Sequence, residues 1–388
     1  MKSSRGITAT GPLAEEIGPG AENEEAVQKL LKGRILPEEY AKHYPNFREE
    51  AREMINSMQN DKRSTKMQWK FGIEEYKELF SKTREETTCG PSGLHMSHWK
   101  AALEDDEIVN LHASMIWAAF ALGYSYDRWN ISYHSMLQKL QKPYITKLRI
   151  IQIFEGDMNG GFKYLFGRVL MKKLVEDGII DPNAYGGIPG RDPLEAMKVL
   201  QYMYDNHRLQ KRDLIVIFND AAGCFDRVRP NQAEICSRRV GCPPSLSKTH
   251  TKLQQNMRHY IKTSAGVSTG TIQYKNTLNQ HEHTITENNN TTTRAGNIGG
   301  VGQGGGASPI EWLVVLLAML NAFKVFSEGA KLIDPNSKYG GKIPVVSFVD
   351  DNSITMTPRP QSTTREIFAA AAKEMEHWKN CYKPQEET

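Results

Sequence analysis

Two apolar segments of the chain each end in aspartate. The β-branched run at residues 214–218 leads to Asp220, and the run at 345–349 leads to Asp350 and Asp351. Neighbouring carboxylates at the end of a buried strand repel one another and lose hydration, and a divalent cation such as Mg²⁺ offsets both effects. Aspartates after a strand also open turns and cap helices, so one such segment alone favours a structural role. Two of them, with the motifs that lie between them, favour a metal-dependent phosphoryl transfer.

The elements that must position these strand ends are predicted from apolar spacing and from breaker residues. Six segments are expected to be helical, at residues 24–32, 38–58, 108–122, 194–207, 312–320 and 363–379. The segment 312–320 is the most apolar of the chain and is typical of a buried helix.

A different composition marks residues 264–306, which are rich in Gly, Asn and Thr. Their centre, 287–294, is expected to form a mobile loop, because such residues gain too little from burial to offset the entropy of ordering. A strand at 267–274 could lead into this loop.

The overall composition is that of an ordinary folded protein, with 388 residues, 39% of them hydrophobic, 24% charged, and a net charge of +4. No apolar run reaches the roughly 20 residues that cross a bilayer, and residues 1–20 hold no apolar block of a secretory signal. The five cysteines are an odd number without a Cys-x-x-Cys pair, which argues against a disulfide framework and a cysteine zinc site. We therefore expect an intracellular protein, in the nucleus or cytoplasm, without a membrane partner.

The distribution of charge is more informative than its total. Residues 1–61 carry 8 basic and 11 acidic side chains, and this acidic, helical N-terminal extension, taken as 1–70, is expected to be solvated. Residues 139–173 carry a net charge of +6, because eight basic side chains face only Glu155 and Asp157. A segment this basic is usually a solvated face unless neighbouring motifs supply an anionic ligand.

Six short blocks stand in a fixed order along the chain. They read CGPSGL at 89–94, KLRII at 147–151, GIPGR at 187–191, DAAGCFDRV at 220–228, GQGGGASP at 302–309 and FVDD at 348–351. In this order, over about residues 88–352, the blocks resemble those of reverse transcriptases, particularly the enzymes of non-LTR retroelements.

The resemblance implies an α+β fold of the right-hand polymerase type. Residues 71–212 would form the fingers, and 213–388 a palm whose antiparallel strands end in Asp220 and Asp350, with helices packed on one face of the sheet. The palm would be incomplete, because the family's thumb has no counterpart in the 37 residues that follow Asp351.

The resemblance also implies a metal site. Asp220 and Asp350 would be the principal ligands of two Mg²⁺ ions, with Mn²⁺ as a possible substitute, and the carbonyl of Ala221 a further ligand. Asp351 would complete the catalytic set, by supporting the metal site or the primer terminus.

Nucleotide-binding roles follow in the same way. Arg149 and Lys147 would hold the triphosphate, since guanidinium groups bind phosphate oxygens bidentately, and would give the basic segment its ligand. Phe225 would lie beneath the incoming sugar and exclude a 2′-hydroxyl, with a plain core aromatic as the alternative. Gln303 would pack beside the nascent base pair, and Gly304 would let the backbone approach the nucleotide.

Two further residues, Gly190 and Arg191, would contact the template from the fingers, with a salt bridge as the alternative for Arg191. The function implied is an RNA-directed DNA polymerase, derived from a retroelement, that acts on an RNA template, a DNA primer and dNTPs. The alternatives are an inactive relic or nucleic-acid-binding fragment and, as a weaker one, an RNA-directed RNA polymerase, against which Phe225 and the block 302–309 argue. Protein partners cannot be read from the sequence.

Overall fold

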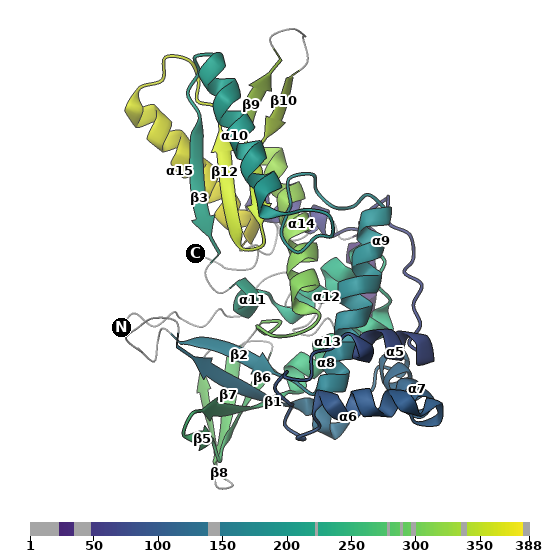
Figure 1. Ribbon diagram of the computed structural model, residues 1–388. Coiled ribbons are helices and arrows are strands. Elements are labelled where there is room, and N and C mark those ends of the chain that lie inside the picture. The colour runs from purple at the N-terminus through teal and green to yellow at the C-terminus, as the bar shows by residue number, and fades with distance from the viewer. Residues whose placement is uncertain are drawn as a thin grey trace.

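The computed structural model describes residues 23–34, 48–138, 148–221, 224–277, 280–287, 290–295, 300–334 and 340–382. They form an α+β fold, as expected. In Figure 1 the upper part holds a three-stranded sheet, a small hairpin and two flanking helices, α10 (Pro193–Leu209) and α15 (Thr364–Tyr382). The lower part holds a seven-stranded sheet and several helices, and the helix α14 runs between the two parts.

The three-stranded sheet contains both aspartate segments. Its order is β11 (Val345–Phe348), β12 (Asp351–Met356) and β3 (Ile215–Asp220), and both pairings are antiparallel. The strands form because β-branched and apolar residues fit a pleated, buried surface. The predicted antiparallel sheet is therefore confirmed, although β3 and β11, the strands that lead to the aspartates, each pair with β12 and not with each other.

Helices cover both faces of this sheet, so the prediction of helices on one face is wrong. Val345 faces the main core together with Ile354, while Val346 packs in a second cluster with Met203 of α10 (Pro193–Leu209). The reason is the alternation of side chains along a strand, which sends two consecutive buried valines to opposite faces. Figure 1 shows α10 on one side of the sheet and α15 (Thr364–Tyr382) on the other.

The main core surrounds α14 (Ser308–Phe326), which is buried over most of its circumference. By length and composition this helix could cross a membrane, but 72% of its most apolar window is buried inside the fold. It packs against α12 (Pro230–Arg239), α15 and α4 (Glu49–Ser57). The predicted buried helix at 312–320 is confirmed as the centre of α14.

The N-terminal helices belong to this same core. Val27 and Leu30 of α2 (Glu24–Leu31) and Met54 and Ile55 of α4 are buried in it. The expected solvated extension is therefore wrong for its described residues, because the apolar side chains of each helix lie on one face and find partners. The predicted helical residues 38–47 lie outside the described residues, and the other predicted helices appear as α2, α7, α10 and α15.

The larger sheet joins segments from both sides of the predicted boundary at residue 212. Its main order is β2-β1-β4-β6-β7-β8, with β5 on β4; β1 and β4 are parallel and every other pairing is antiparallel. The strands are β1 (Ile131–Leu137), β2 (Arg149–Ile153), β4 (Arg258–Thr263), β5 (Gly266–Val267), β6 (Thr271–Thr277), β7 (Gln280–Glu287) and β8 (Asn290–Ala295).

The loop expected at 287–294 is largely a strand. β8 pairs with β7, and three of its register positions place Thr291, Thr292 and Thr293 opposite Thr286, Ile285 and Thr284. Threonine is β-branched, and cross-strand pairs of β-branched residues stabilise a ladder even in a polar segment. The low hydrophobicity of the segment predicted a loop, but hydrophobicity does not include this preference of threonine for extended backbone.

The remaining elements complete the two parts. They are α5 (Ile73–Ser81), α6 (Met96–Ala101), α7 (Asp106–Leu122), α8 (Gly156–Tyr164), α9 (Met171–Glu176), α11 (Cys224–Arg227), α13 (Pro244–Asn256), β9 (Ala330–Ile333), β10 (Gly340–Ile343), a π-helical turn at Leu165–Leu170, and 3₁₀ turns at Ala102–Glu104 and Asp127–Asn130. α7 shows how local signals set helix ends: the side chain of Asp105 accepts hydrogen bonds from the first turn, and Gly123 ends the helix at φ 71°.

Candidate active site

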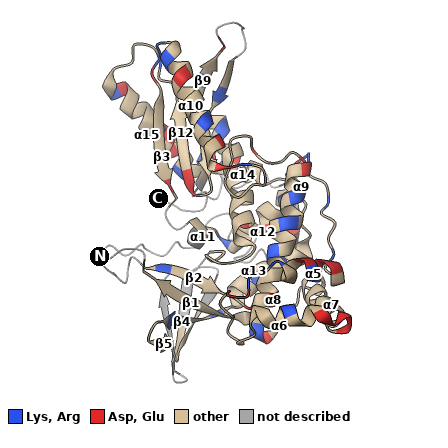
Figure 2. Cartoon of the chain, in the orientation of Figure 1, with Lys and Arg blue, Asp and Glu red and all other residues tan. Residues whose placement is uncertain are grey.

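Three aspartates lie at one end of the three-stranded sheet. The register of β12 and β3 places Asp351 directly opposite Asp220, and Asp350 precedes Asp351 in the turn. The amide N–H of Ala221 donates to the carbonyl oxygen of Asp350 over 3.1 Å, which ties the end of β3 to the turn. In the cartoon of Figure 2 the adjoining ends of β3 and β12 carry the red of acidic residues. The structure thus brings together all four residues that were predicted to hold metal.

The surroundings of Asp351 disfavour its charged form. Desolvation, and then the charges of Asp350 and Asp220, raise the pKa of Asp351 above its usual range. Among the described residues no three or more His, Cys, Asp or Glu side chains form a ready-made metal site, so a cation would have to draw these carboxylates together. Their oxygen atoms are the hard ligands that Mg²⁺ prefers, and a cation would remove the repulsion that raises this pKa. The donor set therefore fits magnesium.

The turn that carries Asp350 has an unusual backbone. Val349 has φ 57°, a left-handed conformation that is a genuine outlier for a β-branched residue. The indole Nε1 of Trp312, on α14, donates to the carbonyl oxygen of Val349 over 2.8 Å. On the other side a Cβ at Gly186 would clash with the side chain and the amide of Val349, so only glycine fits there. Packing from two directions holds the strained turn, as is frequent at functional sites.

The predicted template contacts, Gly190 and Arg191, lie in the loop before α10. Gly190 is exposed and has φ 78°. Arg191 is half-buried, and its Nη1 donates to the carbonyl oxygens of Asp181, over 2.6 Å, and of Ala184. Its guanidinium therefore braces its own loop, and among the described residues it forms no salt bridge.

Backbone contacts connect the carboxylate end to the predicted nucleotide-binding residues. Phe225, on α11, is half-buried against the main core, and its carbonyl oxygen accepts from the amide of Val301 over 2.9 Å. Two residues further on, the carbonyl oxygen of Gln303 accepts from the amide of Gln152 over 2.7 Å. Gln152 belongs to β2, the strand that begins with the exposed Arg149. The predicted Lys147 lies outside the described residues.

The glycine-rich segment needs its glycines because of this close approach. A Cβ at Gly302 would clash with the side chain of Gln152, and a Cβ at Gly304 would clash with its backbone carbonyl. Asn159, on α8, holds the segment from the other side. Its Nδ2 donates to the carbonyl oxygen of Gly304 over 3.2 Å, and its Oδ1 accepts from the amide of Gly306 over 2.5 Å. Sequence reasoning missed Asn159, which has no motif of its own.

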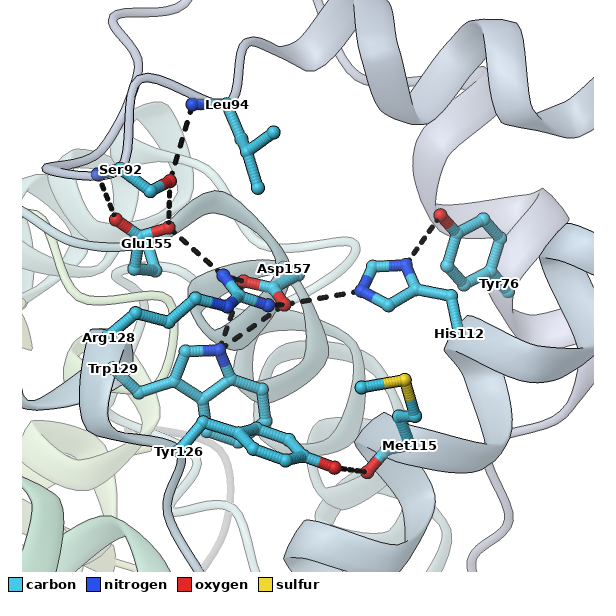
Figure 3. Close-up of polar contacts among 10 residues, drawn as sticks. All are labelled: Tyr76, Ser92, Leu94, His112, Met115, Tyr126, Arg128, Trp129, Glu155 and Asp157. Carbon is cyan, nitrogen blue, oxygen red and sulfur yellow. Dashed lines mark hydrogen bonds and ion pairs between the residues drawn. The ribbon is translucent and has the colours of Figure 1, made fainter.

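A buried ionic network stands behind this segment (Figure 3). Asp157 is fully buried and accepts hydrogen bonds from Arg128, over 2.9 Å, from Trp129, over 3.2 Å, and from His112, over 3.3 Å. Desolvation alone would raise the pKa of Asp157, but the hydrogen bonds from His112 and Arg128 hold it below its usual range. A buried carboxylate with this many partners fixes the start of α8, from which Asn159 projects.

Glu155 extends the network to the predicted block at 89–94. Its side chain accepts from the amide and from the hydroxyl of Ser92, each over 2.7 Å, and from Arg128 over 3.1 Å. A Cβ at Gly90 would clash with the backbone at 154–155. Glu155 and Asp157 are the only acidic residues between 139 and 173. Two carboxylates in such a basic segment could have indicated that they form internal ion pairs.

In the described part of the basic segment, residues 148–173, several basic side chains are paired with carboxylates. Arg168 pairs with Glu78 over 2.9 Å, and the buried Lys173 pairs with Asp177 over 2.5 Å. Lys172 likewise pairs with Glu176. Helical spacing places both lysines beside acidic residues one turn further on, whereas Arg168 meets Glu78 of α5 through tertiary packing.

Comparison with known proteins adds no assignment. No protein-family model and no curated protein matches the chain. The function of the site is therefore argued from its own geometry and from the motifs that compose it.

Proposed function

We propose that the chain is an RNA-directed DNA polymerase that extends a primer 3′-hydroxyl with dNTPs on an RNA template. One observation carries the proposal: Asp351 stands directly opposite Asp220, with Asp350 in the turn between two paired strands. Such a cluster gains nothing for stability, since like charges at adjacent positions repel.

Each residue of the site has a task in this proposal. Asp220, Asp350 and Asp351 would hold two Mg²⁺ ions, which when bound supply charge neutralisation and lower the pKa of the attacking hydroxyl. Arg149 would bind the triphosphate from β2, and Phe225 would exclude a 2′-hydroxyl. The protein's own contribution would be chiefly positioning of primer and nucleotide.

The fold is interpreted in the same terms. The three-stranded sheet with α14 would act as the palm, and the helices of residues 71–212 with β1 and β2 as the fingers. Asn159 would keep the glycine-rich segment against β2, so that the backbone at Gln303 and Gly304 stays close to the nucleotide. Support for this comes from the continuous backbone contacts that run from Phe225 through Val301 and Gln303 to β2.

Primer extension tests the proposal. Wild type, Asp350→Asn and Asp213→Asn are compared on an RNA template with Mg²⁺, with deoxyribonucleotides and ribonucleotides in separate reactions. Asp213 is an exposed aspartate just before the first residue of β3, whereas Asp220 is the last residue of the same strand. Asp213 therefore serves as the matched control. We expect extension with deoxyribonucleotides, a loss of about a hundredfold or more in Asp350→Asn, and no loss in Asp213→Asn.

Three results would contradict the proposal. Extension that survives Asp350→Asn would remove the metal role of the turn. Preference for ribonucleotides would indicate an RNA-directed RNA polymerase. No extension by wild type, with retained binding of RNA, would indicate a nucleic-acid-binding relic.

A further inference from the structure

A pocket of about 400 Å³ lies between α2, the segment 60–66 and the loop that follows α12. Its described lining shares no residue with the carboxylate site. Arg238, Arg239 and Lys66 bring positive charge to its wall, and Asp61 is the one carboxylate among the described lining residues. The volume suits a small organic ligand, and the charge suits an anion.

Arg239 is the unusual member of this wall. Its side chain is only 4% exposed, and its Nη2 donates to Asp61 over 3.2 Å. Its Nε and Nη1 are buried and find no hydrogen-bond partner in the described part of the chain, and desolvation lowers the pKa of Arg239. Asp61 is shared, because Arg63 donates to it over 3.0 and 2.8 Å. A buried guanidinium with two unpaired nitrogens costs stability that a folded protein normally avoids.

Arg238, the neighbouring residue, forms more hydrogen bonds than Arg239, but one of its nitrogens is also unpaired. Its Nη1 donates to Glu24 and to Glu234, each over 3.2 Å, and its Nη2 donates to Glu24, so only its Nε is buried without a partner among the described residues. Lys66 is exposed on the same wall. Two adjacent arginines with unpaired buried donors and one solvated lysine thus line the same pocket.

We propose that this pocket binds a small ligand through a phosphate or pyrophosphate group. The guanidinium of Arg239 lies under the pocket wall and turns toward the ligand, so that its unpaired nitrogens donate to phosphate oxygens. Guanidinium forks match phosphate geometry and form the stronger, charge-assisted class of hydrogen bond. The excess of cations over carboxylates in the wall favours a dianion over a monoanion. The site does not depend on the polymerase proposal.

The energetic cost of Arg239 makes the proposal testable in two independent ways. If this arginine serves only the fold, removing it destabilises the protein. If it serves a ligand, Arg239→Met removes buried unpaired nitrogens and leaves Asp61 with Arg63, so the free protein keeps or gains stability. The same change then removes phosphate binding.

Calorimetric titration of the full chain with inorganic phosphate and with pyrophosphate measures the binding. The titrations contain EDTA and no divalent cation, so that metal-dependent binding at Asp220 and Asp350 does not contribute. Arg168→Met is the matched control, because Arg168 is a half-exposed arginine that also pairs with a carboxylate but lies outside this pocket. Sulfate and citrate are titrated in parallel as anions of other chemistry.

We expect saturable binding of one phosphate or pyrophosphate per chain, weakened about tenfold or more by Arg239→Met and unchanged by Arg168→Met. Lys66→Met, an exposed change that cannot unfold the core, should weaken binding a few-fold and covers the case in which Arg239→Met does not fold. Binding that is equal in wild type, Arg239→Met and Lys66→Met would overturn the proposal, as would equal binding of citrate. Loss of stability in Arg239→Met, with binding intact in Lys66→Met, would also overturn it.

Discussion

The hydrogen bond from Trp312 to the carbonyl of Val349 should hold the strained turn that carries Asp350. Trp312→Phe keeps an aromatic ring but removes the donor. Losing this bond leaves a half-buried carbonyl without a partner and costs about 1–2 kcal/mol. The missing ring atoms enlarge a cavity of about 30 Å³ beside Val349 and Gly186, which adds about 1 kcal/mol. The variant should therefore unfold at a free energy about 2–3 kcal/mol below that of wild type.

Urea denaturation measures this difference in the free energy of unfolding. The rise in melting temperature on adding Mg²⁺ measures whether the turn still holds Asp350 in a position to bind the cation. Phe323→Leu is the matched control, because Phe323 is fully buried near the other end of α14 and packs on Trp378 instead of the turn. We expect both variants to lose stability, but only Trp312→Phe to lose part of the stabilisation by Mg²⁺. A cost below about 0.5 kcal/mol, or an equal change of the Mg²⁺ response in Phe323→Leu, would refute the reasoning.

Three further substitutions have expected outcomes. Asp351→Asn should raise stability at neutral pH, because the raised pKa of Asp351 in the folded state means that folding disfavours its charged form. The gain over wild type should disappear as the pH falls through the pKa of Asp351. Urea titrations at several pH values measure this. Arg128→Met should cost about 3 kcal/mol at neutral pH, since it leaves Asp157 buried with fewer partners, and the deficit should shrink on acidification; an unchanged deficit would contradict this. Phe225→Ala should raise ribonucleotide use relative to deoxynucleotide use by about tenfold or more in single-nucleotide extension, and an unchanged ratio would make Phe225 a core residue only.

Local patterns predicted much of the fold around the site. The β-branched runs before Asp220 and Asp350 became β3 and β11, and the apolar stretch 312–320 became the centre of α14. These predictions hold because each depends on periodicity within one segment. The loop at 287–294 was predicted wrongly for the opposite reason, since its strand depends on pairing with β7.

The supports of the site could not be predicted because they depend on residues far apart in the chain. Trp312 was expected in the core, where it lies, but its donor role requires knowing that the turn at Val349 passes over α14. Asn159 forms hydrogen bonds with Gly304 and Gly306, which are far from it in the sequence, and it belongs to no recognisable motif. The unpaired nitrogens of Arg239 likewise appear only once its neighbours are placed.

The parallel pairing of β1 with β4 has a consequence for the newly made chain. The hydroxyl of Ser132 meets Nδ1 of His259 over 2.7 Å, although 127 residues separate them. At about 5–20 residues per second, translation needs about 6–25 s to deliver the partner strand. During that interval the hairpin of β1 and β2 presents an unpaired edge, which is open to pairing with other chains. The larger sheet should thus close only after β4 has been made, and it should profit from chaperones that shield nascent strands.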